Sequence, residues 1–296
     1  MHKFRRTLFS LMVLQIPLWL GAQKSNLYLF DLLEIAGKYE LHQPRLLSEF
    51  NPDGYNNQPY FIDNYTLILT AAPKEDLANS DIFQLDLRSH EMTRITKTPD
   101  REYSPTLSMQ DPKLFNCVVV DVENGDKQIL WQYPLDRSNG GKAWLKDWEN
   151  VGYFQEMNDN WVAIFEVGTP NKLYLTNSKT GEKKFISNNI GRALRMTKDG
   201  QLIYVHKFSD DYWFLKRLRP ETLLSEIVKK TLPGSEDFTL LDDDSILMGQ
   251  GSKLYRLDQF GENQWKEVAN LEKYGITNIK RLAFNGINEM VIVDQK

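Results

Sequence analysis

Residues Ser80–Thr96, SDIFQLDLRSHEMTRIT, decide the fold that we predict for this chain. They form an apolar run, a polar turn and a second run, which is the pattern of a β-hairpin. Successive copies of the first arm begin 40 to 55 residues apart, a period typical of four-stranded propeller blades. The copies are LYLFDL from Leu27, IFQLDL from Ile82, ILWQYP from Ile129, LYLTNS from Leu173, WFLKRL from Trp213 and LYRLDQ from Leu254.

A second hairpin, with two apolar arms and a short polar turn, lies between these copies each time. The chain opens with a hairpin of the first kind (26–47) and closes with one of the second kind (278–295), each without its partner. We therefore predict an all-β fold, a six-bladed β-propeller with four-stranded antiparallel blades and a ring closed by strands from both termini. The second hairpins begin at Pro59, Pro105, Gly152, Arg192, Phe238 and Arg281.

Several expected strands are apolar at consecutive positions, among them FNCVVV, WVAIF, LIYV and MVIV. Such runs indicate strands that are buried on both faces, as in blades packed between two neighbours. We expect Cys117, in the first run, to be a small buried residue.

The stretch Glu221–Lys230 has aliphatic residues at helical spacing. We still predict the outer strand of the fourth blade there, because the repeat leaves that place empty.

The first 22 residues have the pattern of a secretory signal peptide. Lys3, Arg5 and Arg6 precede the apolar run 8–20, which is shorter than the roughly 20 residues of a spanning helix. We expect cleavage after Ala22, leaving a propeller of residues 23–296 that is periplasmic or secreted and has no membrane span. Cleavage would remove three positive charges and change the formal net charge from −4 to −7. Nucleic acid is therefore not an expected partner.

The sequence has no nucleophile elbow of the Gly-x-Ser-x-Gly type and no phosphate-binding loop, and its acidic clusters lack the ligand spacing of a calcium loop. The sequence therefore predicts no catalytic residue, no metal site and no cofactor. Propeller active sites can gather carboxylates from separate blades without a local motif. The alternative to a binding protein is thus a propeller hydrolase or lyase that acts on carbohydrate in a central channel.

The links from the outer strand of one blade to the inner strand of the next should meet at one mouth of the ring. Function often lies in such loops, and aromatic and arginine side chains most often anchor protein contacts. For each aromatic residue taken singly, the alternative is that it fills a gap between blades. The predicted binding residues are Tyr55, Arg101, Tyr103, Trp144, Trp148, Arg192, Asp237 and Tyr274.

The repeat resembles that of the TolB-like propellers, which are also described as WD-like repeats. The resemblance is clearest from Ser80, where DIFQLDL and TRIT are followed by SPTLS from Ser104. The tryptophan-led turn of that repeat is replaced in this chain by MQDPK, MNDN, MTKDG and LDDDS. The resemblance implies an exported, non-enzymatic propeller that binds another protein in the bacterial cell envelope. No motif indicates which protein that is, or an oligomeric state.

Overall fold

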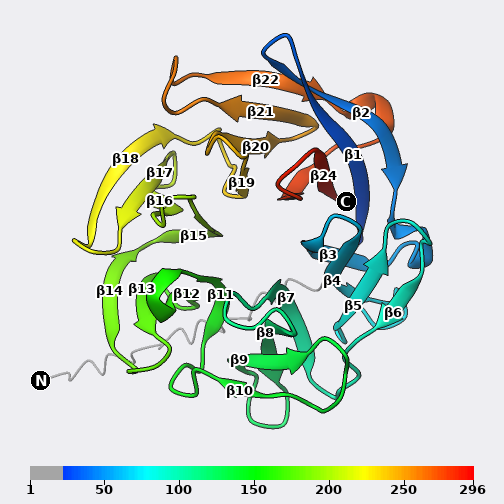
Figure 1. Cartoon of the computed structure of the whole chain (residues 1–296), viewed down its shortest axis with the longest axis vertical. Helices are drawn as coiled ribbons and strands as arrows, with labels where there is room; N and C mark the ends of the chain where they lie inside the picture. The colour runs from blue at the N-terminus through cyan, green and yellow to red at the C-terminus, as the bar shows by residue number, and fades with distance from the viewer. Residues whose placement is uncertain (1–22) are drawn as a thin grey trace, which may run out of the picture.

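The computed structural model describes residues 23–296 as six four-stranded antiparallel sheets arranged in a ring (Figure 1). The expected signal peptide, residues 1–22, lies outside the described residues. The predicted six-bladed propeller is confirmed. Within residues 23–296 no helix has the length and apolar character needed to cross a membrane.

Five blades are formed by consecutive strands, and in each blade the chain runs from the innermost strand outward. Blade 1 is β3 (Tyr55–Asp63), β4 (Thr66–Ala72), β5 (Asp81–Asp86) and β6 (Met92–Arg94), and blade 2 is β7 (Arg101–Leu107), β8 (Leu114–Asp121), β9 (Lys127–Pro134) and β10 (Lys142–Trp144). Blade 3 is β11 (Val151–Glu156), β12 (Trp161–Glu166), β13 (Lys172–Asn177) and β14 (Lys183–Asn188). Blade 4 is β15 (Ile190–Met196), β16 (Leu202–Ser209), β17 (Tyr212–Arg219) and β18 (Leu224–Lys230), and blade 5 is β19 (Phe238–Leu240), β20 (Ile246–Gln250), β21 (Lys253–Leu257) and β22 (Trp265–Asn270).

The sixth blade takes two strands from each end of the chain. Its order from the channel outward is β23 (Ile279–Phe284), β24 (Glu289–Gln295), β1 (Ser25–Ile35) and β2 (Lys38–Leu46). The first of the amino-terminal strands, β1, lies beside the red β24, and the register pairs Leu27 with Val293 (Figure 1). The predicted closure by both termini is confirmed, and it leaves no open edge between β1 and β24.

Six clusters of buried apolar side chains lie one between each pair of neighbouring blades. Strand β24 is apolar at four consecutive positions, 290–293. Met290 and Ile292 pack toward blade 5, whereas Val291 and Val293 pack toward blade 1. Because successive side chains of a strand point to opposite faces, a sheet between two neighbours needs apolar residues on both.

Two local predictions are also confirmed. The stretch with helical spacing contains β18, an edge strand paired with β17, because tertiary pairing outweighs a weak helical pattern. The Cys117 side chain is buried, with 0% of its surface exposed, and burial raises the pKa of its thiol well above the usual value.

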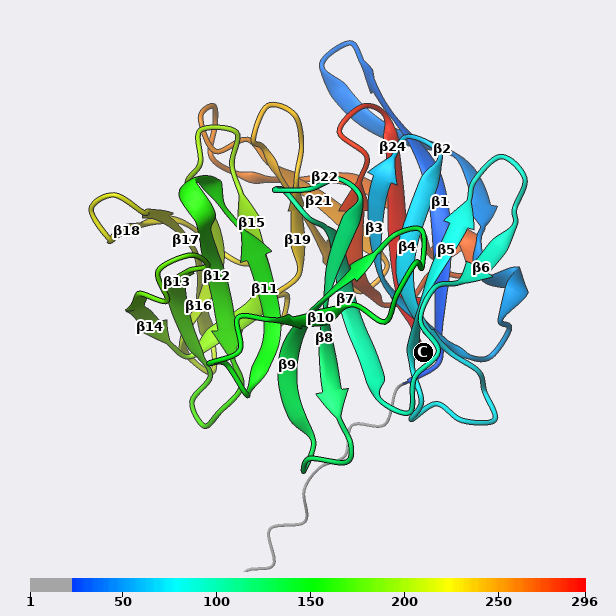
Figure 2. The same cartoon turned by 60° about the horizontal axis from the view of Figure 1, so that its bottom comes forward.

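Strands β3 and β11 run in the same direction along the axis of the ring (Figure 2), and residues at or near the starts of β3, β15, β19 and β23 line one cavity. The pairing of innermost strands is interrupted by bulges or irregularities, for example between Ile190 and Leu194 in β15 and between Ile279 and Arg281 in β23. A bulge changes which side chains of a strand point to a given face. These irregularities therefore affect which residues line the central channel.

Candidate functional site

A cavity of about 470 Å³ opens at the mouth where the innermost strands begin. It lies among blades 1, 3, 4, 5 and 6, and most of its polar lining comes from blades 5 and 6. The residues that line it are Gln23, Tyr55, Tyr153, Arg192, Pro233, Gly234, Ser235, Glu236, Asp237, Gly249, Gln250, Gly251, Asn278, Ile279, Lys280, Arg281, Leu282 and Gln295. We call this space the outer chamber.

Arg281 of β23 is held from two sides at the floor of the outer chamber. Its Nη1 donates to Asp237 Oδ1 at 3.2 Å, and its Nη2 donates to the Tyr153 hydroxyl at 2.8 Å. The other carboxylate oxygen of Asp237 accepts from the backbone N–H of Leu282 at 3.0 Å. Burial alone would lower the pKa of Arg281, but Tyr153 and Asp237 raise it above its usual value. Asp237 thus fastens the innermost strand of blade 6 to blade 5.

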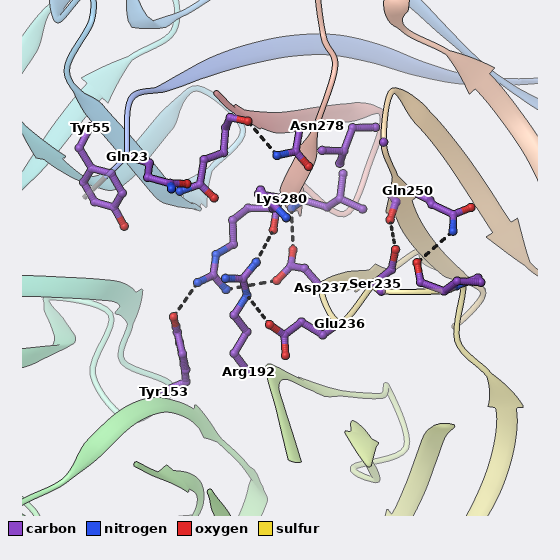
Figure 3. A pocket seen from close by; sticks show the side chains of 18 residues that line it. Gln23, Tyr55, Tyr153, Arg192, Ser235, Glu236, Asp237, Gln250, Asn278 and Lys280 are labelled. Carbon is purple, nitrogen blue, oxygen red and sulfur yellow. Dashed lines mark hydrogen bonds and ion pairs between the residues drawn. The ribbon is translucent and has the colours of Figure 1, made fainter. Parts of the chain in front are cut away.

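Arg192 of β15 lies beside the same group (Figure 3). Its Nη2 donates to the backbone carbonyl of Lys280 at 3.2 Å, and its Nε lies 3.5 Å from Glu236 Oε1. Lys207 Nζ lies 2.6 Å from the second oxygen of Glu236. Burial alone would raise the pKa of Glu236, but the charges of Arg192 and Lys207 lower it below its usual value. Glu236 is therefore an ionised carboxylate at neutral pH.

A second cavity of about 280 Å³ lies farther along the channel and shares Tyr153, Arg192, Arg281 and Leu282 with the first. We call it the inner chamber. It is lined by three arginines, including Arg195, and by no aspartate or glutamate. The residues that line it are Gln58, Pro59, Tyr60, Phe61, Ser104, Pro105, Thr106, Tyr153, Phe154, Gln155, Arg192, Leu194, Arg195, Thr239, Arg281, Leu282, Ala283, Phe284 and Asn285.

The two carboxylates of the outer chamber are poorly suited to acid–base hydrolysis. That chemistry needs a carboxyl group that holds a proton near neutral pH, which requires a raised pKa. Glu236 has a lowered pKa, and both oxygens of Asp237 already accept hydrogen bonds within the fold. Among residues 23–296, no three His, Cys, Asp or Glu side chains are grouped so that they could hold a metal ion. The arrangement fits binding of a charged group better than proton transfer.

Three of the eight predicted binding residues, Tyr55, Arg192 and Asp237, line the outer chamber together. Figure 3 shows Tyr153, Arg192, Glu236 and Asp237 pointing toward one another. The Tyr55 side chain is buried, and burial raises the pKa of its hydroxyl far above the usual value. Their role in binding stays a prediction.

The other five predicted residues lie outside the lining of both chambers. Tyr103, Trp144 and Trp148 pack in the cluster between blades 2 and 3, where the Trp148 ring lies edge-on to Tyr174 at 5.2 Å. In the same way Tyr274 packs against Phe30 at 5.6 Å, in the cluster between blades 5 and 6. Arg101 forms an ion pair with Asp126. The structure thus places the four aromatic residues in gaps between blades, which is the alternative to a role in binding.

Among the lining residues that the sequence did not predict are Tyr153, Arg195, Glu236, Lys280 and Arg281. Four of them lie inside innermost strands, whereas the predicted binding residues were expected in the links between blades. A signal was present in RALRM from Arg192 and KRLAF from Lys280, which place arginines within short strands that are otherwise apolar. A charge inside such a strand indicates a polar interior, because an unpaired buried charge is costly.

Comparison with known proteins supports the fold and leaves the activity open. Neither a family model nor a curated protein matches the sequence. The chain resembles a chain in the crystal structure of a nidogen/laminin complex, with a TM-score of 0.66 and 10% identity over 92% of this chain and 100% of that one. It also resembles TolB from Acinetobacter baumannii, with a TM-score of 0.57 and 13% identity over 93% of this chain and 65% of that one.

A third similar structure is a puromycin-hydrolysing peptidase from Mycobacterium tuberculosis, with a TM-score of 0.56 and 10% identity. This chain is covered to 81% in that comparison but spans only 44% of the peptidase. The fold and the channel therefore define a six-bladed β-propeller, similar at low identity to a chain of a nidogen/laminin complex, to TolB and to a peptidase. Because function lies in sites and not in folds, the function has to be inferred from the residues that line the channel.

Proposed function

We propose that this chain is an exported, non-enzymatic propeller of the TolB-like type that binds a partner protein in the bacterial cell envelope. Its binding site is the outer chamber and the rim around it. The observation that carries the proposal is the charge arrangement of that chamber. Glu236 forms ion pairs with Arg192 and Lys207, and Asp237 forms one with Arg281. The carboxylates hold the site together, and cationic and aromatic groups remain to contact a partner.

Lys280 supports this assignment. It lines the outer chamber, and within residues 23–296 no carboxylate oxygen lies within 4.0 Å of its ammonium group. Tyr55, Tyr153 and Arg192 lie around the same opening, and tyrosine and arginine are the side chains that most often anchor protein interfaces. A loop or chain end of a partner with acidic character fits an opening of this size and charge.

A photo-crosslinking residue in place of Lys280 tests the proposal in envelope extracts of the source cells. We expect one covalent product, which is lost when Arg192→Glu is added. The matched control places the same crosslinker at Tyr65, which is 51% exposed in the turn between β3 and β4, at the opposite mouth. Equal products from both positions, or a product that survives Arg192→Glu, would remove the binding site from the outer chamber.

The export part of the proposal rests on Lys3, Arg5 and Arg6 before the apolar run, and it is tested separately. Mass spectrometry of the protein from the periplasm or medium should find an amino terminus at Gln23. Cytoplasmic protein that begins at Met1 would contradict export. Hydrolysis or elimination of oligosaccharides by the purified protein would support the carbohydrate-active alternative instead.

A further inference from the structure

The inner chamber concentrates positive charge in a protein whose formal net charge is −4. Arg192, Arg195 and Arg281 line it, and none of its lining residues is acidic. Arg192 and Arg281 face Glu236 and Asp237 on the side of the outer chamber. On the inner side the three guanidinium groups have no such counter-charge in the lining.

Arg195 of β15 carries most of this excess. Only one of its nitrogens donates to another described residue, from Nη1 to the Leu194 carbonyl at 2.9 Å. No carboxylate oxygen within residues 23–296 lies within 4.0 Å of its guanidinium group, and its Nε and Nη2 are not sealed from solvent. A planar guanidinium with a free edge matches the two oxygens of a carboxylate or phosphate.

Burial lowers the pKa of the Arg195 guanidinium, and the Asp237 carboxylate offsets this only in part, while Arg281 adds to it. The charge of Arg195 is therefore costly where it lies. A bound anion would offset this cost, because a charge away from water is stabilised by a partner of opposite sign.

Gln58 of β3 adds a neutral donor from the other side of the chamber. Its Oε1 accepts from the backbone N–H of Ser104 at 2.9 Å and from the Thr70 hydroxyl at 2.8 Å. These two bonds fix the orientation of the amide, and its Nε2 makes no hydrogen bond to the described residues. Thr106 and Asn285 supply further polar groups to the lining.

We propose that the inner chamber binds an anionic group, a carboxylate or a phosphate, with Arg195 as its main ligand and Arg192, Arg281 and Gln58 as supporting donors. The inference rests on the proposed function, because the anionic group would belong to the segment of the partner that enters through the outer chamber. Its volume of about 280 Å³ suits one charged group together with a few attached atoms.

Calorimetric titration of the purified protein tests this with three probes: inorganic phosphate, N-acetylglycine and its neutral match N-acetylglycinamide. We expect phosphate or N-acetylglycine to bind and to raise the thermal midpoint, and the amide to do neither. Arg195→Gln should weaken anion binding about 10- to 100-fold, the effect of losing charge-assisted hydrogen bonds. Arg88→Gln, at a position with 68% of its side chain exposed, should leave binding unchanged.

Binding of one anion and not the other supports the proposal and identifies the source of the charge. Arg195→Lys serves if the glutamine variant fails to fold, since it keeps the charge and loses the planar fork, and it should weaken binding several-fold. The proposal is overturned if neither anion binds at millimolar concentration, or if the Arg195 variants bind like Arg88→Gln. If the crosslinker at position 280 still captures a partner in that case, the outer chamber remains the proposed binding site and only the anion site in the inner chamber is rejected.

Discussion

Replacing Glu102 with glutamine should make the stability of this protein less dependent on pH. Glu102 lies in β7 between blades 1 and 2, with 0% of its surface exposed. Thr98 donates a hydrogen bond to one carboxyl oxygen, and the other oxygen has no partner among the described residues. Burial, with smaller contributions from Asp81 and Asp100, raises the pKa of Glu102 from 4.5 to about 8.

The sign of the effect follows from proton binding. The unfolded chain loses this proton near pH 4.5, whereas the folded protein keeps it until about pH 8. Between these values the folded state holds this proton and the unfolded chain does not, so the contribution of Glu102 to stability is greatest below pH 4.5 and is lost as the pH rises through about 8. A shift of this size corresponds to at most about 5 kcal/mol.

Urea denaturation at about pH 5 and about pH 9 measures the difference. Wild type and Glu102→Gln should have similar free energies of unfolding at the lower pH, and the variant should be more stable by up to about 5 kcal/mol at the higher pH. Glu123→Gln, at an exposed position, is the matched control and should follow wild type. Equal pH slopes for wild type and Glu102→Gln would refute the reasoning.

Three further predictions concern the packing and the channel. Ile292→Ala, at 0% exposure, should lower the free energy of unfolding by about 2–5 kcal/mol, and Ile287→Ala, at 62% exposure, by less than about 0.5 kcal/mol. Equal losses in urea denaturation would contradict the clusters between blades. Asp237→Ala should cost about 3–5 kcal/mol because it leaves Arg281 buried without its carboxylate, and an unchanged midpoint would mean that the pair does not fasten blade 6 to blade 5. Cys117 should react with a thiol reagent only on unfolding, and fast labelling of folded protein would contradict its burial.

The blades could be predicted from sequence because their signal is local and repeated. Each copy of the hairpin, such as the one from Ser80, carries its own apolar arms and polar turn, and the copies reinforce one another. Closure by both ends follows from the order of the hairpins, without any knowledge of distances. The outer strand β18 was predictable for the same reason, although its own residues suit a helix by spacing.

The site was predicted only in part. The sequence around a residue does not determine whether its side chain points into the channel or into the packing between blades. Arg192 and Asp237 lie at or near the start of innermost strands, close to the links between blades where binding residues were expected. Trp148 also lies in a link between blades, but its ring packs against Tyr174 in the cluster between blades 2 and 3. Arg195 lies inside β15 beyond an irregularity in its pairing, and such an irregularity changes the face to which a residue points.

The central claim is that the two ends of the chain share one blade, since this brings Lys280 and Arg281 of β23 to the channel beside Asp237. A cysteine pair tests it most directly. Asp31 and Glu289 are opposite partners in β1 and β24, and such partners are close enough for a disulfide. Asp31→Cys with Glu289→Cys should form an intramolecular disulfide on mild oxidation, seen by peptide mapping, whereas Asp31→Cys with Lys179→Cys should not. A pair that stays reduced, or that forms no faster than the control pair, would contradict the shared blade.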